Sequence, residues 1–234
     1  FLENHDYPRV IPRYVSREFR EIGAKMLAVA MYFMKGTPYI YQGQEIGMTN
    51  IENFKPRDYA DILSKNVYKI AKNYFPPLIP VVKWVLGKRA RDHARTPMQW
   101  TAGENAGFTK GKPWMIVNPN YKEINVEAAQ KDPDSVLNFY KKLIKFRLGN
   151  KIIKDGSYRE FYPKSDKIFA YARELGAQKY LVVTNWTDKV AGFVLPEEFK
   201  GKPSKLVMSN YADAEQSARD EFNLMPYEAV VYEF

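Results

Sequence analysis

The triplet Asn4-His5-Asp6 is the first group of side chains in the sequence with the types needed for chemistry. It sets an amide, an imidazole and a carboxylate side by side after the apolar start Phe1-Leu2, and Pro8 fixes the backbone φ just beyond it. Polar side chains placed where a buried strand ends are in the position of catalytic groups in α/β barrels. The alternative interpretation is a polar turn in which Asp6 caps a helix.

A second polar cluster, Gln42 to Met48, contains the carboxylate of Glu45 and follows a short apolar run. The β-favouring residues 37–41, bounded by glycines, predict a buried strand. Between the two clusters, helical spacing of apolar residues predicts a helix over 17–35, with Ser16 as its cap. A strand, a helix and a second strand form the α/β repeat of a parallel sheet, so both polar clusters are expected on one face.

The stretch 91–100 holds a third cluster, with arginines at positions 91 and 95 and a tryptophan at position 100. Solvent linkers rarely carry Met-Gln-Trp, so we expect this loop to fold back onto the protein. The surrounding region, 49–133, is irregular, with helices predicted near 58–74 and 80–86.

The C-terminal part changes from a helical to an alternating pattern near residue 151. Before it, Asp132 and Pro133 predict a helix that starts there and ends at Gly149. After it, short alternating runs separated by turns predict a small antiparallel β-sandwich. We therefore predict an α/β domain over 1–150 and a β-sandwich domain over 151–234. The predicted strands are 157–162, 167–173, 179–186, 191–195, 205–209 and 227–234.

Composition limits the classes of function. The 234 residues are 45% hydrophobic and include no cysteine, which excludes disulfides and thiolate metal sites and fits a cytoplasmic location. The net charge of +9 suggests nucleic acid, yet most lysines alternate with acids, so we expect no nucleic-acid partner. No run of eighteen apolar residues exists, and we expect no membrane partner. We also expect no cofactor and no metal, because no EF-hand-like acidic loop is present.

Three sequence motifs, in this order, carry a resemblance to a known family. They are FLENHDYPR, MKGTPYIYQGQEIGMTN, and KRARDHARTPMQW with the following NAGFTKGKPWMIVNPNYKEIN. Together they resemble the C-terminal portion of oligo-1,6-glucosidases and close α-glucosidases of the α-amylase superfamily (glycoside hydrolase family 13). The resemblance implies that 1–150 is the C-terminal part of a (β/α)8 TIM barrel, comprising strands seven and eight and the closing helix.

The resemblance also implies roles for individual residues. Asp6 matches the third carboxylate of the family, which stabilises the transition state by binding sugar hydroxyls more tightly as the ring flattens. His5 matches a histidine that donates to a hydroxyl of the same glucose. Arg91 matches an arginine that contacts the sugar in the cleavage subsite, and Arg95 is expected to brace the loop through salt bridges, although the reverse assignment stays open.

Asn4 and Glu45 are further candidates, and we expect a structural role for Glu45. Two positions depart from the family pattern. Leu63 stands where members commonly have a glutamate near the leaving-group sugar, and Tyr7 replaces a common glutamine. Preference beyond the first glucose is therefore left open by the sequence.

The function implied is that of a retaining α-glucosidase hydrolysing α-1,6 or α-1,4 glucosidic bonds of short oligosaccharides. Because the family's nucleophile and acid/base lie on earlier strands, we expect this chain to be inactive alone and to require an upstream barrel segment or a companion chain. Within the same fold, the alternatives are a sucrose isomerase, a trehalose-6-phosphate hydrolase or a glucosyltransferase. Outside catalysis, the alternative is an interaction protein similar to a transporter heavy chain, against which the intact polar cluster argues.

Overall fold

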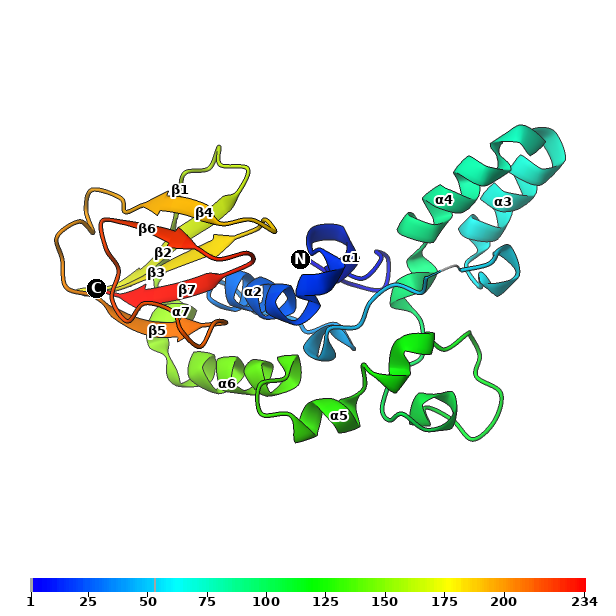
Figure 1. The fold of residues 1–234 in the computed structure, drawn as a ribbon, viewed down its shortest axis with the longest axis horizontal. Helices are drawn as coiled ribbons and strands as arrows, with labels where there is room; N and C mark the ends of the chain where they lie inside the picture. The colour runs from blue at the N-terminus through cyan, green and yellow to red at the C-terminus, as the bar shows by residue number, and fades with distance from the viewer. Residues whose placement is uncertain (1, 53) are drawn as a thin grey trace. The chain divides into compact units, whose positions relative to one another are not determined.

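A computed structural model describes residues 2–52 and 54–234 (Figure 1). The chain forms two compact units, Phe1–Arg13 with Ile40–Leu137, and Tyr14–Tyr39 with Asn138–Phe234. We call these the first and the second unit. The predicted domain boundaries, 1–150 and 151–234, remain proposals. The helices are α1 (Ile11–Tyr14), α2 (Arg20–Tyr32), α3 (Ile62–Tyr74), α4 (Ile79–Arg89), α5 (Val126–Lys131), α6 (Val136–Gly149) and α7 (Lys151–Asp155).

The second unit is built on a five-stranded antiparallel sheet in the order β1-β2-β3-β7-β5, accompanied by the two-stranded sheet β4-β6. Strand residues alternate between two faces. One face, which includes Ala170, Leu181 and Val230, packs with the β4-β6 pair in one apolar core. The strands are β1 (Ser157–Phe161), β2 (Ile168–Leu175), β3 (Gln178–Asn185), β4 (Ala191–Val194), β5 (Lys205–Ser209), β6 (Glu221–Leu224) and β7 (Ala229–Glu233).

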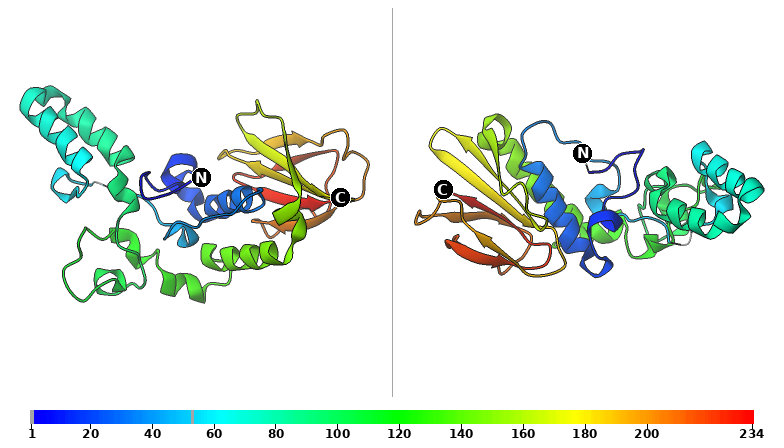
Figure 2. Two further views of the ribbon diagram at one scale, coloured as in Figure 1. Left: turned by 180° about the vertical axis from the view of Figure 1, so that it is seen from behind. Right: turned by 90° about the horizontal axis from the view of Figure 1, so that it is seen from above.

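Helices α2 and α7 cover the other face of the large sheet (Figure 2). Two buried side chains of β2 tie them down. The hydroxyl of Tyr171 donates to Ala30 O in α2 at 2.8 Å. The guanidinium of Arg173, 0% exposed, donates to Phe33 O just after α2 and to Ile153 O in α7. These bonds satisfy carbonyls that a helix leaves open at its C-terminal end.

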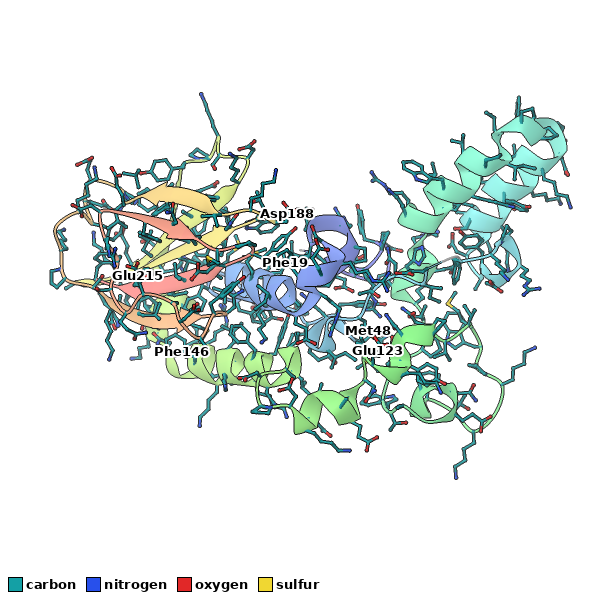
Figure 3. All side chains as sticks on the ribbon, viewed as in Figure 1. Phe19, Met48, Glu123, Phe146, Asp188 and Glu215 are labelled. Atoms are coloured by element: carbon teal, nitrogen blue, oxygen red, sulfur yellow. The ribbon has the colours of Figure 1, made fainter. Side chains whose placement is uncertain are left out.

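The segment leading into α2 is fixed by side chains of the second unit rather than by a helix cap. Ser16 makes no capping bond; its backbone N–H donates to the hydroxyl of Tyr227 at 3.0 Å, and its hydroxyl donates to Asp188. The ring of Phe19 contacts that of Tyr227, and Figure 3 labels Phe19 and Asp188 in this region. The predicted cap at Ser16 is wrong, and the α-helix begins four residues later, after a 3₁₀ turn.

The first unit holds the predicted polar clusters on loops, short 3₁₀ turns and the helical hairpin α3–α4. One apolar cluster packs Tyr59 and Leu86 beneath the hairpin. A second packs Met48, which Figure 3 labels, with Met98 and Ile124. The prediction that the 91–100 loop folds back onto the protein is confirmed for residues 92–99, which are buried apart from position 95.

The predicted strand over 37–41 is wrong, because these residues form no strand and Tyr39 is 87% exposed. The composition of this run favours a strand, but a parallel strand needs a neighbouring strand to bond with, and none is paired with it among the residues that the structure describes. Residues 2–4, where a buried strand is predicted to end, likewise form no strand, and residue 1 lies outside the described residues.

The helix predicted from Asp132 begins instead at Val136. Asp132 ends α5, an element that the sequence interpretation missed, since its N–H donates to Ala128 O. Its carboxylate accepts from Asp134 N at 2.9 Å, which forms a local turn in place of a helix cap. Helix α7 and strand β6 were also missed, whereas the six predicted strands after residue 151 are all present within a few residues.

Candidate functional site

Asp6 lies at the centre of a network of charged side chains in the first unit. Its Oδ1 accepts hydrogen bonds from Arg91 Nη1 at 3.3 Å and from Arg95 Nη2 at 3.1 Å. Its Oδ2 lies 3.2 Å from His5 Nε2. The Asp6 side chain is 44% exposed, so the carboxylate is oriented by two cations while part of its surface stays open.

Asp61 forms the second carboxylate of the network and is almost completely buried. Its Oδ1 accepts from Arg91 Nη2 at 2.8 Å and from Arg95 Nη1 at 3.4 Å. Each arginine therefore bridges Asp6 and Asp61, and the four side chains form a closed ring. Planar guanidinium groups that bind two carboxylates at once have little freedom to rotate, so the ring fixes where Asp6 points.

Asp61 is also tied to the hairpin, because its Oδ2 accepts from Ser64 N at 3.1 Å and caps α3. Burial by itself would raise the pKa of Asp61, but the Ser64 bond and the charges of Arg91 and Arg95 outweigh burial and lower it. At neutral pH this carboxylate is therefore ionised and able to hold both arginines.

Asp92, 0% exposed, fixes the backbone on which Asp61 stands. Its carboxylate accepts from Ala60 N and from Asp61 N, each at 3.1 Å. Burial raises the pKa of Asp92, and these two backbone bonds oppose that effect. The 3₁₀ turn Arg91–Ala94 thus contributes one arginine to the ring and, in the next residue, an anchor for the opposite side of the ring.

A second, fully buried charge pair supports the loop that carries Asp6. Arg9 donates from Nη1 to Glu3 Oε1 at 2.8 Å, and both side chains are at most 1% exposed. Arg9 also donates to Ala94 O at 3.3 Å. Because its partners come from before Asp6 and from the arginine-bearing turn, Arg9 joins the two segments of the network. Burial raises the pKa of Glu3, and the nearby Arg9 charge opposes this.

The structure brings together most of the predicted site residues, but not all of them. His5, Asp6, Arg91 and Arg95 lie within one network, and Arg95 Nε also donates to His5 O at 2.9 Å. Asn4 Oδ1 accepts from Asp6 N at 2.8 Å, so it shapes the turn rather than facing the network.

Glu45 lies elsewhere, near Glu3, where its charge contributes to raising the Glu3 pKa. Its Oε2 is buried and has no hydrogen-bond partner among the described residues. The roles of all these residues stay proposals.

The sequence interpretation missed Asp61 as a member of the site. The available signal was the spacing Asp61-x-x-Ser64 before an apolar helix, which is typical of a cap, but we predicted the helix start at position 58. Asp61 is linked to Asp6 through Arg91 and Arg95, which lie 30 and 34 residues farther along the chain. In the described part of the chain, no group of three or more histidine, aspartate or glutamate side chains is arranged to hold a metal ion.

Comparison with known proteins places these features in a family context. Residues 1–156 match the model of the alpha amylase catalytic domain, and residues 168–231 match the model of the alpha-amylase SusG C-terminal domain. The matched order confirms the predicted fold class, the C-terminal part of an α/β catalytic domain followed by an antiparallel β domain. No helix among the described residues is long and apolar enough to cross a bilayer.

Several known proteins align along nearly the whole chain. It is 47% identical to a probable oligo-1,6-glucosidase 2 from Bacillus subtilis, covering 99% of this chain and 41% of that protein. Among solved structures, trehalose-6-phosphate hydrolase from Bacillus licheniformis superposes with a TM-score of 0.93 at 40% identity, covering 99% of this chain and 42% of that one. The trehalulose synthase MutB from Pseudomonas mesoacidophila superposes with a TM-score of 0.90 at 35% identity, covering 100% and 42%. The chain therefore spans about 41% of the length of the first relative.

Proposed function

The chain belongs to the alpha-amylase family, and from this membership we propose that it supplies part of the active site of a retaining α-glucosidase of the oligo-1,6-glucosidase type. The proposed substrates are short oligosaccharides with α-1,6 or α-1,4 glucosidic bonds. The observation that carries the proposal is the arrangement of Asp6, a partly exposed carboxylate oriented by two arginines through a single oxygen.

Asp6 is suited to stabilising a transition state rather than to transferring a proton. An ionised carboxylate only accepts hydrogen bonds, and sugar hydroxyls are donors of matching geometry. In the oxocarbenium-like transition state of glycoside hydrolysis the ring carries positive charge, and hydrogen bonds to it strengthen. Asp6, held still by Arg91 and Arg95, contributes differential binding of that state.

His5 and the arginines have complementary roles in the proposal. The His5 side chain is 69% exposed beside Asp6, so its imidazole is free to turn toward a hydroxyl of the same glucose. Arg91 is the more exposed arginine of the ring, at 36% against 26% for Arg95, which favours Arg91 as the sugar contact and Arg95 as the brace.

The nucleophile and the acid/base of the retaining reaction come, in this proposal, from an upstream barrel segment in the same polypeptide or in a companion chain. We include a cytoplasmic location in the proposal, since a chain without cysteine needs no oxidising compartment.

A substrate panel tests the proposal with the protein at its native length, whose intact mass is measured first. Release of glucose is followed from isomaltose, maltose, sucrose and trehalose 6-phosphate. The expected result is the highest kcat/KM on isomaltose. The highest value on trehalose 6-phosphate would assign the alternative hydrolase function, and conversion of sucrose without hydrolysis would assign an isomerase. No turnover of any of the four would contradict the enzymatic proposal.

A further inference from the structure

The helical hairpin α3–α4 exposes an apolar stripe on its first helix that no described residue covers. The stripe consists of Leu63, Val67, Ile70 and Tyr74, which follow one another at steps of four, three and four residues. This spacing puts all four on one line along the helix. They are 60%, 36%, 52% and 73% exposed, so the line faces outward.

The second helix repeats the pattern. Val81 and Val85 of α4, together with Leu78 just before the helix, follow one another at steps of three and four residues and are exposed, and Trp84 is 63% exposed. The connection between the helices, Phe75-Pro76-Pro77-Leu78, is exposed and apolar throughout. The whole tip of the hairpin therefore presents aliphatic and aromatic side chains.

Helix geometry places the two stripes on the same face of the hairpin. The helices run antiparallel (Figure 1) and pack through Tyr68 of α3 and Val82 and Leu86 of α4. At about 100° per residue, each exposed stripe is offset from its own buried line by about 90° in the same sense along the chain. In an antiparallel pair equal offsets point to the same side, so the stripes form one continuous apolar face.

The charge of the hairpin is of one sign. Residues 62–90 contain five lysines and one arginine and no aspartate or glutamate, giving +6 of the chain's net +9. Lys65, Lys69 and Lys72 lie on the side of α3 away from the apolar stripe. Lys88 Nζ lies 4.5 Å from the centre of the Trp84 ring. The six cations are Lys65, Lys69, Lys72, Lys83, Lys88 and Arg89.

We propose that the α3–α4 hairpin is a docking surface for a membrane rich in anionic lipid. An amphipathic helix with lysines on one side and aliphatic and aromatic side chains on the other lies in the interface plane, with its apolar face among the acyl chains. Tyrosine and tryptophan are side chains that settle at the headgroup level. A second copy of this chain is disfavoured as the occupant, because the two hairpins would bring +6 against +6.

This inference is independent of the proposed glucosidase activity, and it revises one expectation from the sequence. The absence of an apolar run long enough to span a bilayer led us to expect no membrane partner. A hairpin that lies on the surface needs no such run, since its apolar residues are distributed over two helices of 13 and 11 residues.

The test is sedimentation of the protein at its native length with vesicles of phosphatidylcholine, alone or with 30% phosphatidylglycerol. We expect binding to the anionic vesicles that weakens with salt and little binding to the neutral ones. Changing Lys69 and Lys72 to glutamine should weaken binding about 30-fold, because each lysine near an anionic membrane surface increases the affinity about fivefold. The matched control changes Lys142 and Lys145 of α6 to glutamine and should leave binding within twofold.

A second variant pair addresses the apolar face. Ile70→Ser with Trp84→Ser should weaken binding at least tenfold, whereas Trp114→Ser, which removes a similarly exposed tryptophan outside the hairpin, should not. Circular dichroism of each variant verifies the fold. Absence of binding to anionic vesicles overturns the proposal, and so does binding that the hairpin variants leave unchanged. A concentration-dependent dimer lost in Ile70→Ser would assign the face to a second copy and overturn it as well.

Discussion

Replacing Asp61 by asparagine separates the charge of this residue from its capping role. Asparagine has nearly the same volume, and its amide oxygen still accepts the Ser64 N–H, so the α3 cap is retained. What is lost is the attraction for Arg91 and Arg95, which now depend on the partly exposed Asp6 alone. The expected result is a less stable first unit and a less firmly oriented Asp6.

The magnitude follows from the geometry of the two bonds. A hydrogen bond to a charged group contributes about 1.5–3 kcal/mol when it is buried. The Arg91 bond is short at 2.8 Å and the Arg95 contact long at 3.4 Å, and both arginines are partly exposed. Discounting for solvent screening, we expect a loss of about 2 kcal/mol in the free energy of unfolding. Asp61→Ala should lose about 3 kcal/mol, because the cap is removed as well.

The assay is urea unfolding followed by tryptophan fluorescence. Among the tryptophans of this chain, Trp84, Trp100 and Trp114 lie in the first unit and Trp186 lies in the second, so their emission mainly reports the unit that contains Asp61. Both variants should lower the urea midpoint without changing the slope of the transition. If the free energies of unfolding of both variants lay within about 0.5 kcal/mol of that of the unchanged protein, Asp61 would not stabilise the ring.

The pH dependence provides an internal control on the same variant. The pKa of Asp61 is lowered in the folded state. Its contribution to the free energy of unfolding is therefore fully present above the unfolded-state pKa of about 3.9, and it is lost as pH falls through the folded-state pKa. The difference in free energy of unfolding between the unchanged protein and Asp61→Asn should be constant near neutral pH and shrink below pH 4. A difference that grows on acidification would give the wrong sign and contradict the assignment.

Two further predictions concern the second unit and the hairpin. Arg173→Met should lower the free energy of unfolding by about 3–5 kcal/mol, because the buried carbonyls that accept hydrogen bonds from Arg173 would lose their donor. Hydrogen exchange of the β2 amides measures this loss. Gly156→Ala should cost about 2–4 kcal/mol, since its Cβ would lie 2.4 Å from Ile152 O, whereas Gly87→Ala in α4 meets nothing within 4 Å and should stabilise by about 0.5–1 kcal/mol. Equal melting temperatures for the two glycine variants would contradict this comparison.

The C-terminal half was predictable because its signals are local. In β2, Ala170 and Ala172 face the apolar core while Tyr171 and Arg173 face the helices. The residue types alternate in the sequence with the same period of two. The missed strand β6 is only four residues long and has a single apolar pair, so its pattern is too short to recognise.

The first unit was harder to predict because its order comes from contacts distant in sequence. The apolar run 37–41 has strand-like composition, but composition does not say whether a neighbouring strand is available. Asp132 has the form of a helix cap, yet the preceding α5 already uses its backbone. The motifs identified His5, Asp6, Arg91 and Arg95 as a group, whereas Asp61 and Asp92 act through bonds that no local pattern reveals.

The exposed apolar hairpin was visible in the sequence only in part. The net charge of +9 and the acids that alternate with most lysines describe the chain as a whole, and they do not reveal that residues 62–90 carry six cations and no acid. The burial of Leu86 and the partial burial of Tyr68 and Val82 show which side of each helix is used for packing, and hence that a second apolar side is left open.

The kinetics of Asp6→Asn test the central claim most directly, in the protein at its native length and with isomaltose as substrate. The change keeps the size of the side chain and leaves the bond from the Asp6 N–H to Asn4 in place, but it removes the charge that Arg91 and Arg95 orient. The account predicts a fall in kcat of about 100-fold or more, with KM changed far less and the urea midpoint nearly unaltered. An unchanged kcat in a properly folded variant would contradict the role assigned to Asp6.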